Sequence, residues 1–415
     1  MRPLVGNEPN STDVLARLLS GEEVDIQGLV ADTGLSASTV LRSVDLLMNV
    51  RGMVESRPSA SVGPGRPARR VALNRRFSLV AGVDLGGTNC RFVLSDALGS
   101  PIAKARLSTP RNLGAEGLAD WLAAHVQSLA VEYGAGVDLG AVGIGLPGAV
   151  TLARDRVVGS LNLPAIVGTA FMDRVVALID APVRFDNDSN LALLGELNYG
   201  DSPRSETTVL LILGTGVSAA AAVHGEILSG ADGSLGEFGR LAMPGQDVLV
   251  RDLLSGAGLP EYARRRGHSI STSRELVADP ERYADLLSEI HDALQHVLGI
   301  IALAYEPRAI LLSGGFSDLF DEDELQTISA RMRANTLVEC DVRASSLRDD
   351  SGLLGAMALG LLTLYQEYGV EPAQLNGLAE ASAVSGALAA ATIAHWAAQP
   401  RAATSVMTTP REITM

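Results

Sequence analysis

The feature that most constrains the fold of this chain is a strand, turn, strand unit that occurs twice, about 130 residues apart. The first unit joins the apolar segment 79–83 to a second apolar segment through Gly86-Gly87-Thr88, and the second unit joins 209–213 to 217–223 through Gly214-Thr215-Gly216. Tight Gly/Thr turns expose backbone N–H groups and a hydroxyl, which can hold a phosphate. We therefore predict a duplicated α/β domain of two lobes, with a phosphate-binding turn in each.

Two further features of this region suit a nucleotide. Asp84, which comes before the first turn, can hold a hydrated Mg²⁺. Gly314 and Gly315 follow the apolar segment 309–312 and suit the close approach of a flat ligand such as adenine. Each turn taken singly is also compatible with an ordinary hairpin, but the three together favour a nucleotide site.

The first 78 residues differ in charge from the rest of the chain. They hold ten arginines against eight carboxylates, a net charge of +2, whereas the whole chain carries −15. Taken alone, a net charge of −15 disfavours nucleic acid as a partner. The asymmetry instead predicts a basic module at 1–78 that is fused to an acidic main body.

Apolar spacing within 1–78 predicts three helices in a helix-turn-helix arrangement. Ser11 and Thr12 can cap the first helix and Asp25 the second, and the turn 33–35 precedes the third. In this motif the last helix lies in the major groove of DNA and presents its N-terminal residues to base edges. The residues that we expect to face outward are Ser38, Thr39, Arg42 and Ser43, with Ala37, Val40, Leu41, Val44 and Leu47 inward.

Two short strands, at 53–57 and 69–73, are joined by a loop that is typical of a wing. Arg66 lies in this loop between a glycine and a proline, and Arg69 and Arg70 follow it, so guanidinium groups are available to a minor groove. The sequence thus predicts a winged helix-turn-helix that binds double-stranded operator DNA. The alternative is a small helical domain with a solvated basic loop.

These motifs resemble the ROK family, named for repressors, open reading frames and sugar kinases, within the actin-like ATPase superfamily. The resemblance covers about residues 79–369, and a preceding winged helix is typical of the family's transcriptional regulators. It implies a two-lobed, ribonuclease H-like sugar kinase fold, with lobes of roughly 79–186 plus 352–369 and 187–351. The ATP-binding residues that it implies are Asp84, Gly86, Gly87, Thr88, Gly214, Thr215, Gly216, Gly314 and Gly315.

The resemblance also implies a sugar site, with Asp188 as the catalytic base. A carboxylate suits this role because phosphoryl transfer needs a group that takes the hydroxyl proton. The competing interpretation is that residues 186–188 form a turn and cap a helix that runs through 191–197. The sugar-binding residues that the resemblance implies are Gly148, Asn162, Asn187, Asp188 and Glu237.

The chain departs from ROK kinases where these carry a zinc loop. In the kinases the segment that contains Glu237 continues with a zinc-binding histidine, and then with a cysteine-rich loop that ends in a sugar-binding glutamate. Here Arg240 replaces the histidine, and 241–256 contains neither Cys nor His. The chain has only two cysteines, Cys90 and Cys340, which are far apart in sequence. We therefore expect no zinc and no other structural metal.

The shortened loop brings Arg251 or Asp252 near the position of the missing glutamate. We expect Arg240 to grip a phosphate or carboxylate of a carbohydrate-like effector in bidentate fashion. The alternative is that Arg240 is a solvent-facing loop arginine.

The chain shows no sign of a membrane or secretory segment. Its apolar stretches are too short and too interrupted to span a bilayer, and its first residues lack a signal-peptide pattern. The few cysteines fit a reducing compartment, so we expect a cytoplasmic protein. The segment 370–415 is rich in Ala, Ser and Thr and is expected to be disordered, apart from a weak helix within 379–396.

The sequence as a whole favours a non-enzymatic role, as a transcriptional regulator, most simply a repressor, controlled by a sugar or sugar derivative. A homodimer or tetramer is expected because two half-sites need two recognition helices. The alternative is an ATP-dependent sugar kinase with a fused DNA-binding domain, supported by the intact turns and by Asp188. A third possibility is that only the sugar cleft functions and the nucleotide turns do not.

Overall fold

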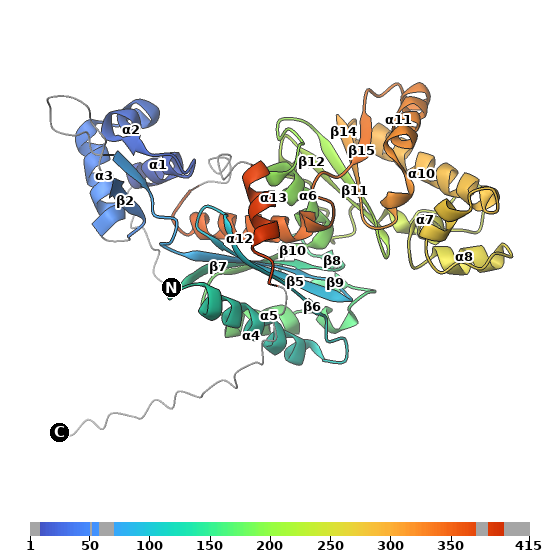
Figure 1. Cartoon of the computed structure of the whole chain (residues 1–415), viewed down its shortest axis with the longest axis horizontal. Coiled ribbons are helices and arrows are strands. Elements are labelled where there is room, and N and C mark those ends of the chain that lie inside the picture. The colour runs from blue at the N-terminus through green and yellow to red at the C-terminus, as the bar shows by residue number, and fades with distance from the viewer. Residues whose placement is uncertain (1–8, 50–51, 58–69, 371–380, 394–415) are drawn as a thin grey trace, which may run out of the picture.

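Two five-stranded mixed sheets form the main body of the computed structural model, which describes residues 9–49, 52–57, 70–370 and 381–393 (Figure 1). The first sheet has the order β10-β7-β4-β5-β6 and the second the order β13-β12-β11-β14-β15. The strands of the first sheet are β4 (Leu79–Leu85), β5 (Asn89–Asp96), β6 (Pro101–Ser108), β7 (Leu139–Leu146) and β10 (Val183–Asn187). Those of the second are β11 (Thr208–Leu213), β12 (Val217–Val223), β13 (Glu226–Ile227), β14 (Ala309–Ser313) and β15 (Asp341–Ala344).

The two sheets share one topology. In each, the first three strands form an antiparallel meander, and the last two lie parallel to the first strand on its other side. In each, the turn between the first two strands carries the Gly/Thr motif. This repeated topology confirms the predicted duplication into two α/β lobes.

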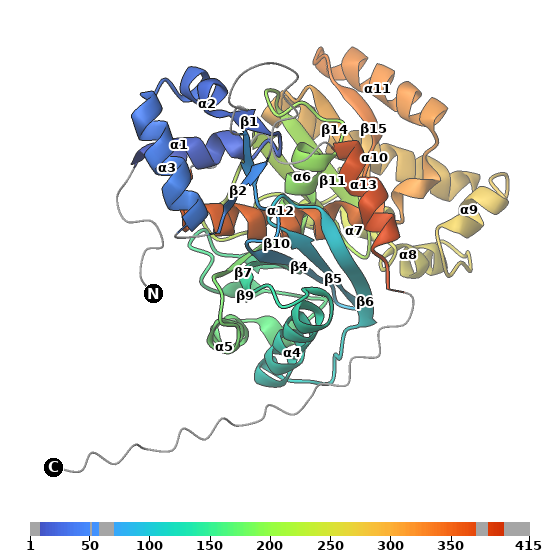
Figure 2. The ribbon, with the colours of Figure 1, turned by 60° about the vertical axis from the view of Figure 1, so that its left-hand side comes forward.

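Helices cover both faces of the sheets (Figure 2). In the first lobe α4 (Ala115–Tyr133) and α5 (Ala170–Leu178) pack together, and their apolar residues share a core with the strands. The second lobe packs its sheet against a separate group of helices. These are α7 (Val250–Leu254), α8 (Leu259–Arg265), α9 (Arg274–Ala278), α10 (Ala284–Tyr305) and α11 (Glu322–Thr336).

Helices α6 (Asp188–Tyr199) and α12 (Ser351–Gln366) connect the lobes in close contact with each other. A Cβ atom placed on Gly355 would lie 1.6 Å from the carbonyl oxygen of Leu191, and one on Gly195 would lie 2.2 Å from that of Ser351. Glycines on α12 and α6 therefore allow the two backbones to touch. Helix α12 is buried almost all round, which agrees with its nearly continuous apolar sequence.

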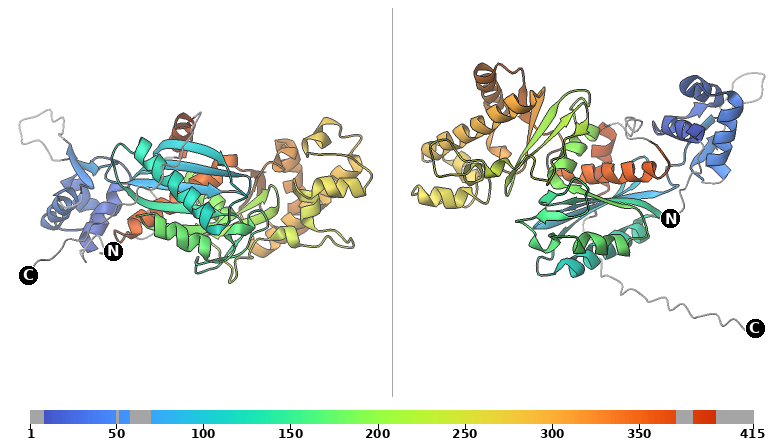
Figure 3. Two further views of the ribbon diagram at one scale, coloured as in Figure 1. Left: turned by 90° about the horizontal axis from the view of Figure 1, so that it is seen from below. Right: turned by 180° about the vertical axis from the view of Figure 1, so that it is seen from behind.

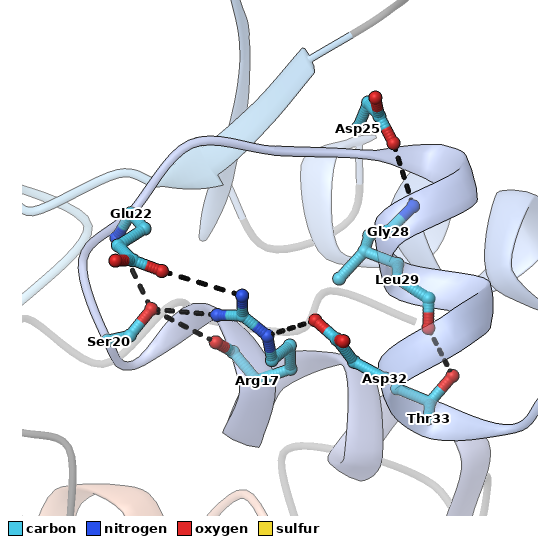
Figure 4. A network of polar contacts seen from close by, with 8 residues as sticks. All are labelled: Arg17, Ser20, Glu22, Asp25, Gly28, Leu29, Asp32 and Thr33. Atoms are coloured by element: carbon cyan, nitrogen blue, oxygen red, sulfur yellow. Dashed lines mark hydrogen bonds and ion pairs between the residues drawn. The ribbon is translucent and has the colours of Figure 1, made fainter.

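The N-terminal unit contains three helices and a small sheet of order β1-β3-β2. Asp25 caps α2 by accepting a hydrogen bond from the Gly28 N–H at 2.7 Å, and Gly34 ends the helix with φ of 70°. Arg17 joins α1 to α2 through Asp32 (Figure 4). The elements are α1 (Pro9–Leu18), β1 (Val24–Asp25), α2 (Ile26–Thr33), α3 (Ala37–Asn49), β2 (Val54–Arg57) and β3 (Arg70–Leu73).

This unit lies at one end of the long axis of the molecule and packs against the last turns of α12 (Figure 3). Phe77, at the junction of the unit with the main body, makes an edge contact with Tyr368, with ring centroids 6.0 Å apart. The Tyr365 hydroxyl donates a hydrogen bond to the carbonyl of Ala97. Thr12 on α1 lies 3.4 Å from the carbonyl oxygen of Tyr368. The unit and α12 therefore share one core.

Part of the segment after α12 is helical. Helix α13 (Ala381–Ala390) packs against β6 and α6, and the backbone of Lys104 then bonds to Ala391 and Ile393 at 2.8 and 2.9 Å. Residues 371–380 and 394–415 lie outside the described part of the chain.

One helix among the described residues, α10, is long and apolar enough to cross a membrane by length and composition alone. Its apolar stripe, which includes Ile290, Leu294, Val297 and Ile301, is fully buried in the core of the second lobe. A core helix passes the same test, and α10 has the burial of one.

Candidate active-site cleft between the lobes

The first phosphate turn is held by the segment that follows β6. The Thr109 hydroxyl donates to the carbonyl of Gly86 at 2.7 Å, and the Thr109 N–H donates to the carbonyl of Thr88 at 2.9 Å. A Cβ atom on Gly87 would lie 2.7 Å from the carbonyl oxygen of Asn162. The structure thus places the first phosphate turn directly against a residue of the predicted sugar site.

The second phosphate turn, between β11 and β12, faces open space. No atom lies within 4 Å of a Cβ built on Gly216 or on Gly315, so these backbones are accessible to a ligand. Gly314 has φ of 89°, and a Cβ there would lie 2.4 Å from the carbonyl oxygen of Leu213. Both the positive φ and the close carbonyl therefore favour glycine at this position.

Asn187 and Asp188 begin α6 and have different tasks. The Asn187 side chain caps the helix by accepting from the N–H groups of Ser189 and Asn190 at 2.9 and 3.2 Å, and its amide donates to the carbonyl of Gly148 at 2.7 Å. Asp188 instead lines the cleft between the lobes. The capping interpretation is therefore correct for Asn187 and leaves Asp188 available for chemistry.

The electrostatic environment of Asp188 suits a proton acceptor. Burial, followed by the negative charges of Asp84 and Glu237, raises the pKa of this carboxyl to about 7, although the Ser189 N–H lowers it. A general base is most effective when its pKa lies near the working pH.

The cleft has a volume of about 550 Å³ and brings most of the predicted ligand-binding residues together. The predicted residues that line it are Asp84, Gly86, Gly87, Thr88, Asn162, Asp188, Thr215 and Gly314. Gly148 and Asn187 are joined by a hydrogen bond but do not line this cleft. Glu237 is near enough to Asp188 to raise its pKa. Arg240, at the end of a short 3-10 turn (Phe238–Arg240), is exposed and does not line the cleft.

In the region that corresponds to the zinc loop, Arg251 and Asp252 make local structural contacts. Arg251 packs beside Gly239, and Asp252 accepts a hydrogen bond from the N–H of Leu249 at 3.0 Å to begin α7. Neither residue lines the cleft. In the described part of the chain, no group of three or more His, Cys, Asp and Glu side chains is placed to hold a metal.

Two arginines that sequence reasoning missed are bound to carboxylates of the site. Arg91 on β5 donates through Nε to Asp84 Oδ2 at 2.9 Å. Arg154 places Nε and Nη2 each 2.8 Å from Asp186 Oδ2, while Asp186 Oδ1 accepts from the Asn187 N–H. Arg154 thereby positions the start of α6. The Arg91–Asp84 pair follows from the β4–β5 hairpin, whose register places the two residues opposite each other. No local pattern marks the Arg154–Asp186 pair, because these residues are 32 positions apart.

The faces of α3 differ from the prediction at three positions. Ser38 and Arg42 are exposed, as expected, and Thr39 is partly so. Ser43, expected outward, is fully buried, whereas Ala37 and Leu41, expected inward, are exposed, Leu41 by 40%. The reason is helical geometry, because the buried stripe is Val40, Ser43, Val44 and Leu47, which follows the i, i+3, i+4, i+7 spacing. Arg70 is half exposed and lies 4.0 Å from Glu23, whereas Arg66 and Arg69 lie outside the described residues.

The fold and the cleft define a class, namely two-lobed actin-like proteins with a Gly/Thr turn in each lobe and a carboxylate between them. Within this class the chain belongs to the ROK family, whose model matches residues 80–362. It is similar to the N-acetyl-D-glucosamine kinase of Pectobacterium carotovorum, with 29% identity over 68% of this chain and 98% of the kinase. It is also similar to the glucokinase of Halalkalibacterium halodurans, with 24% identity over 70% and 96%.

Solved structures show the same fold. The ROK hexokinase of Thermus thermophilus has a TM-score of 0.59 and 24% identity over 68% of this chain and 98% of its own. A ROK family transcriptional regulator, homologous to the E. coli MLC protein, has a TM-score of 0.69 and 15% identity over 92% of this chain and 100% of its own. The match to the regulator therefore extends over more of this chain than the match to the hexokinase does.

Proposed function

We propose that this protein is an ATP-dependent sugar kinase, in which Asp188 accepts the proton of the sugar hydroxyl. The observation that carries the proposal is that Asp188, with a pKa of about 7, lines one cleft with residues of both phosphate turns. Similarity to sugar kinases over almost their entire length supports it. This is the alternative that the sequence left open, and it now has better support than a purely regulatory role.

The residues of the cleft fit ATP and Mg²⁺ in part. The first turn lines the cleft and the backbone of the second turn is open at Gly216, so both suit phosphate groups, and the region of Gly314 suits the adenosine. Bound Mg²⁺ would neutralise phosphate charge. Asp84 is the residue that would hold it, although one oxygen of its carboxylate already accepts from Arg91.

The chain's own residues supply the proton transfer and the positioning. As the sugar oxygen bonds to the terminal phosphorus of ATP, the Asp188 carboxylate takes the hydroxyl proton and ADP leaves. Asn162, beside the first phosphate turn, orients the sugar next to that phosphate. Arg154, through Asp186 and Asn187, holds Asp188 in place as a positioning residue.

A coupled ADP-release assay tests this function. We expect the full-length protein to release ADP only in the presence of a sugar, for at least one member of a panel that includes glucose, N-acetylglucosamine and N-acetylmannosamine. Reactions without sugar measure the background hydrolysis of ATP. A rate that no sugar raises above this background would contradict the kinase proposal.

A second candidate function, regulation of transcription, is favoured by the N-terminal unit. Its third helix exposes Ser38, Leu41 and Arg42, and the fold match to a regulator covers 92% of the chain. We propose that this unit reads a DNA operator through α3, and that a dimer or tetramer of the chain presents two such helices. A kinase cleft and a DNA-reading unit are compatible within one chain.

Fluorescence anisotropy with the DNA upstream of the protein's own gene tests this second function. We expect salt-sensitive, sequence-specific binding that Arg42→Ala weakens by about 1–3 kcal/mol, because Arg42 faces outward on α3. Arg331→Ala, which removes an exposed arginine of α11, serves as the matched control and leaves binding unchanged. Equal binding to unrelated DNA, or none at all, would contradict a role for α3 as an operator reader.

A further inference from the structure

Three arginines line the cleft without a carboxylate partner within the described residues. They are Arg106 on β6, Arg111 in the segment after β6, and Arg348 in the 3-10 turn Arg348–Asp350. All three side chains belong to exposed residues. No task in the proposed proton transfer requires them.

Hydrogen bonds hold the segment of Arg111 against the first phosphate turn, and strand register places Arg106 beside Arg91. Arg111 follows Thr109, which bonds to both Gly86 and Thr88 of that turn. Arg106 stands directly opposite Arg91 in the β5–β6 register, so their Cβ atoms are roughly 5 Å apart.

The turn that carries Arg348 is fixed from two sides. Arg91 donates a hydrogen bond to the carbonyl of Asp349, and Lys104 Nζ on β6 lies 2.6 Å from Asp350 Oδ1. Arg348 itself has φ of 48°, in the left-handed region that is unfavourable for residues other than glycine. The fold therefore holds this arginine at the cleft despite an unfavourable backbone conformation.

The cleft has more arginine than carboxylate side chains once the ion pairs are taken into account. Arg91 is paired with Asp84, and Lys104 with Asp350. Three arginines then remain against two carboxylates of the cleft, Asp349 and Asp188, and the pKa of Asp188 is about 7. In a chain whose net charge is −15, this local excess of guanidinium groups suits an anion.

We propose that Arg106, Arg111 and Arg348 form an oxyanion site, beside the first phosphate turn, that binds a phosphate group in addition to those held by the two turns. Guanidinium groups bind phosphate through paired N–H donors and remain charged at all physiological pH values. The extra phosphate can belong to a phosphoryl donor with a longer phosphate chain, or to a separate phosphorylated compound. The site deepens the proposed kinase function but does not depend on phosphoryl transfer.

Calorimetric titrations with inorganic phosphate, pyrophosphate and tripolyphosphate test the site. They use the full-length Asp188→Asn protein, so that the result is independent of catalysis. We expect salt-sensitive binding of at least one probe, and a dissociation constant at least about tenfold higher when Arg106, Arg111 and Arg348 are all replaced by glutamine. Arg331→Gln, on α11, serves as the control, because it also removes the charge of one arginine. We expect it to leave binding unchanged.

Further arms of the experiment distinguish the two sources of the phosphate. If inorganic phosphate still binds when a non-hydrolysable ATP analogue fills the cleft, and also when adenosine tetraphosphate does, the ligand is a separate compound. If adenosine tetraphosphate blocks inorganic phosphate and the triphosphate analogue does not, the site belongs to a phosphoryl donor with a longer phosphate chain. If the triphosphate analogue itself blocks inorganic phosphate, the arginines hold the phosphates of ATP and the proposal is overturned. Equal binding by the parent and the folded triple variant, or binding of no probe to the parent, would overturn the proposal. Circular dichroism and the melting temperature verify that the triple variant is folded.

Discussion

Replacement of Asp188 by asparagine is expected to lower sugar-dependent ADP release by about 10²- to 10⁴-fold. The amide keeps the shape of the side chain at the start of α6 but cannot accept the hydroxyl proton. Binding of an ATP analogue should persist, because the Gly/Thr turns that hold phosphate are not altered. The coupled ADP-release assay and a calorimetric titration measure the two effects separately.

Asp292→Asn is a matched control for this variant, because it makes the same chemical change at an exposed carboxylate. Asp292 lies on α10 in the second lobe. It should retain full activity. Sugar-dependent release at the wild-type rate by the Asp188→Asn protein would remove Asp188 from its role as the base.

The pKa of Asp188 also sets the pH dependence of the reaction. Only the deprotonated carboxylate can accept a proton, so kcat/KM should rise with pH and level off above about 7. The free energy of unfolding changes with pH in the opposite direction to kcat/KM. Because burial raises the folded-state pKa, the folded protein binds more protons than the unfolded chain between about pH 4 and 7, and it loses stability as pH rises through that range.

Asparagine removes the free-energy cost of a buried, ionised carboxylate. Asp188→Asn should therefore raise the free energy of unfolding of the ligand-free protein at pH 8, on the order of 1–2 kcal/mol after allowance for solvent screening. Near pH 4 the two proteins should melt at similar temperatures. Thermal unfolding at both pH values measures the difference.

Gly355→Ala is expected to destabilise the protein by about 3 kcal/mol or more. A Cβ at this position would lie 1.6 Å from the carbonyl oxygen of Leu191, and neither backbone can move without separating α12 from α6. Gly299→Ala on α10 makes the same chemical change in a helix where a Cβ meets no atom within 4 Å. It should gain about 0.5–1 kcal/mol from helix propensity.

Urea unfolding followed by circular dichroism gives the midpoints of both glycine variants. We expect the midpoint to fall for Gly355→Ala and to rise for Gly299→Ala. Because both variants replace glycine by alanine, this difference separates the effect of close backbone approach from that of helix propensity. An unchanged midpoint for Gly355→Ala would mean that α12 and α6 do not touch in solution as the structure places them.

Local patterns predicted the repeated units of this fold well, because each turn motif lies directly between two apolar strands. The same patterns were less informative at the edge of a helical stripe. Leu41 is apolar and was expected to face inward, but its angular position on α3 lies beside the buried stripe, while the small Ser43 falls within it. Hydrophobicity indicates which residues tend to be buried. Whether a helical residue faces the core depends on its angular position, which advances by about 100° per residue.

The pairs that shape the cleft were beyond sequence reasoning for a different reason. Arg91 contacts the carbonyl of Asp349, which is 258 positions away, and Lys104 contacts Asp350 across 246 positions. Such contacts depend on how α12 docks onto the first sheet. A single sequence contains no periodic signal for docking between distant elements, so these charged residues looked like ordinary surface residues.

Helix α12 has a consequence for communication within the molecule. Its first turn places Gly352 against Asp84, where a Cβ would lie 3.1 Å from Oδ2, and its last turn places Tyr365 in the core of the N-terminal unit. Sixteen helical residues span about 24 Å. The same helix therefore contacts the cleft at one end and the core of the N-terminal unit at the other. The two regions are joined by one continuous helix and not by a flexible linker.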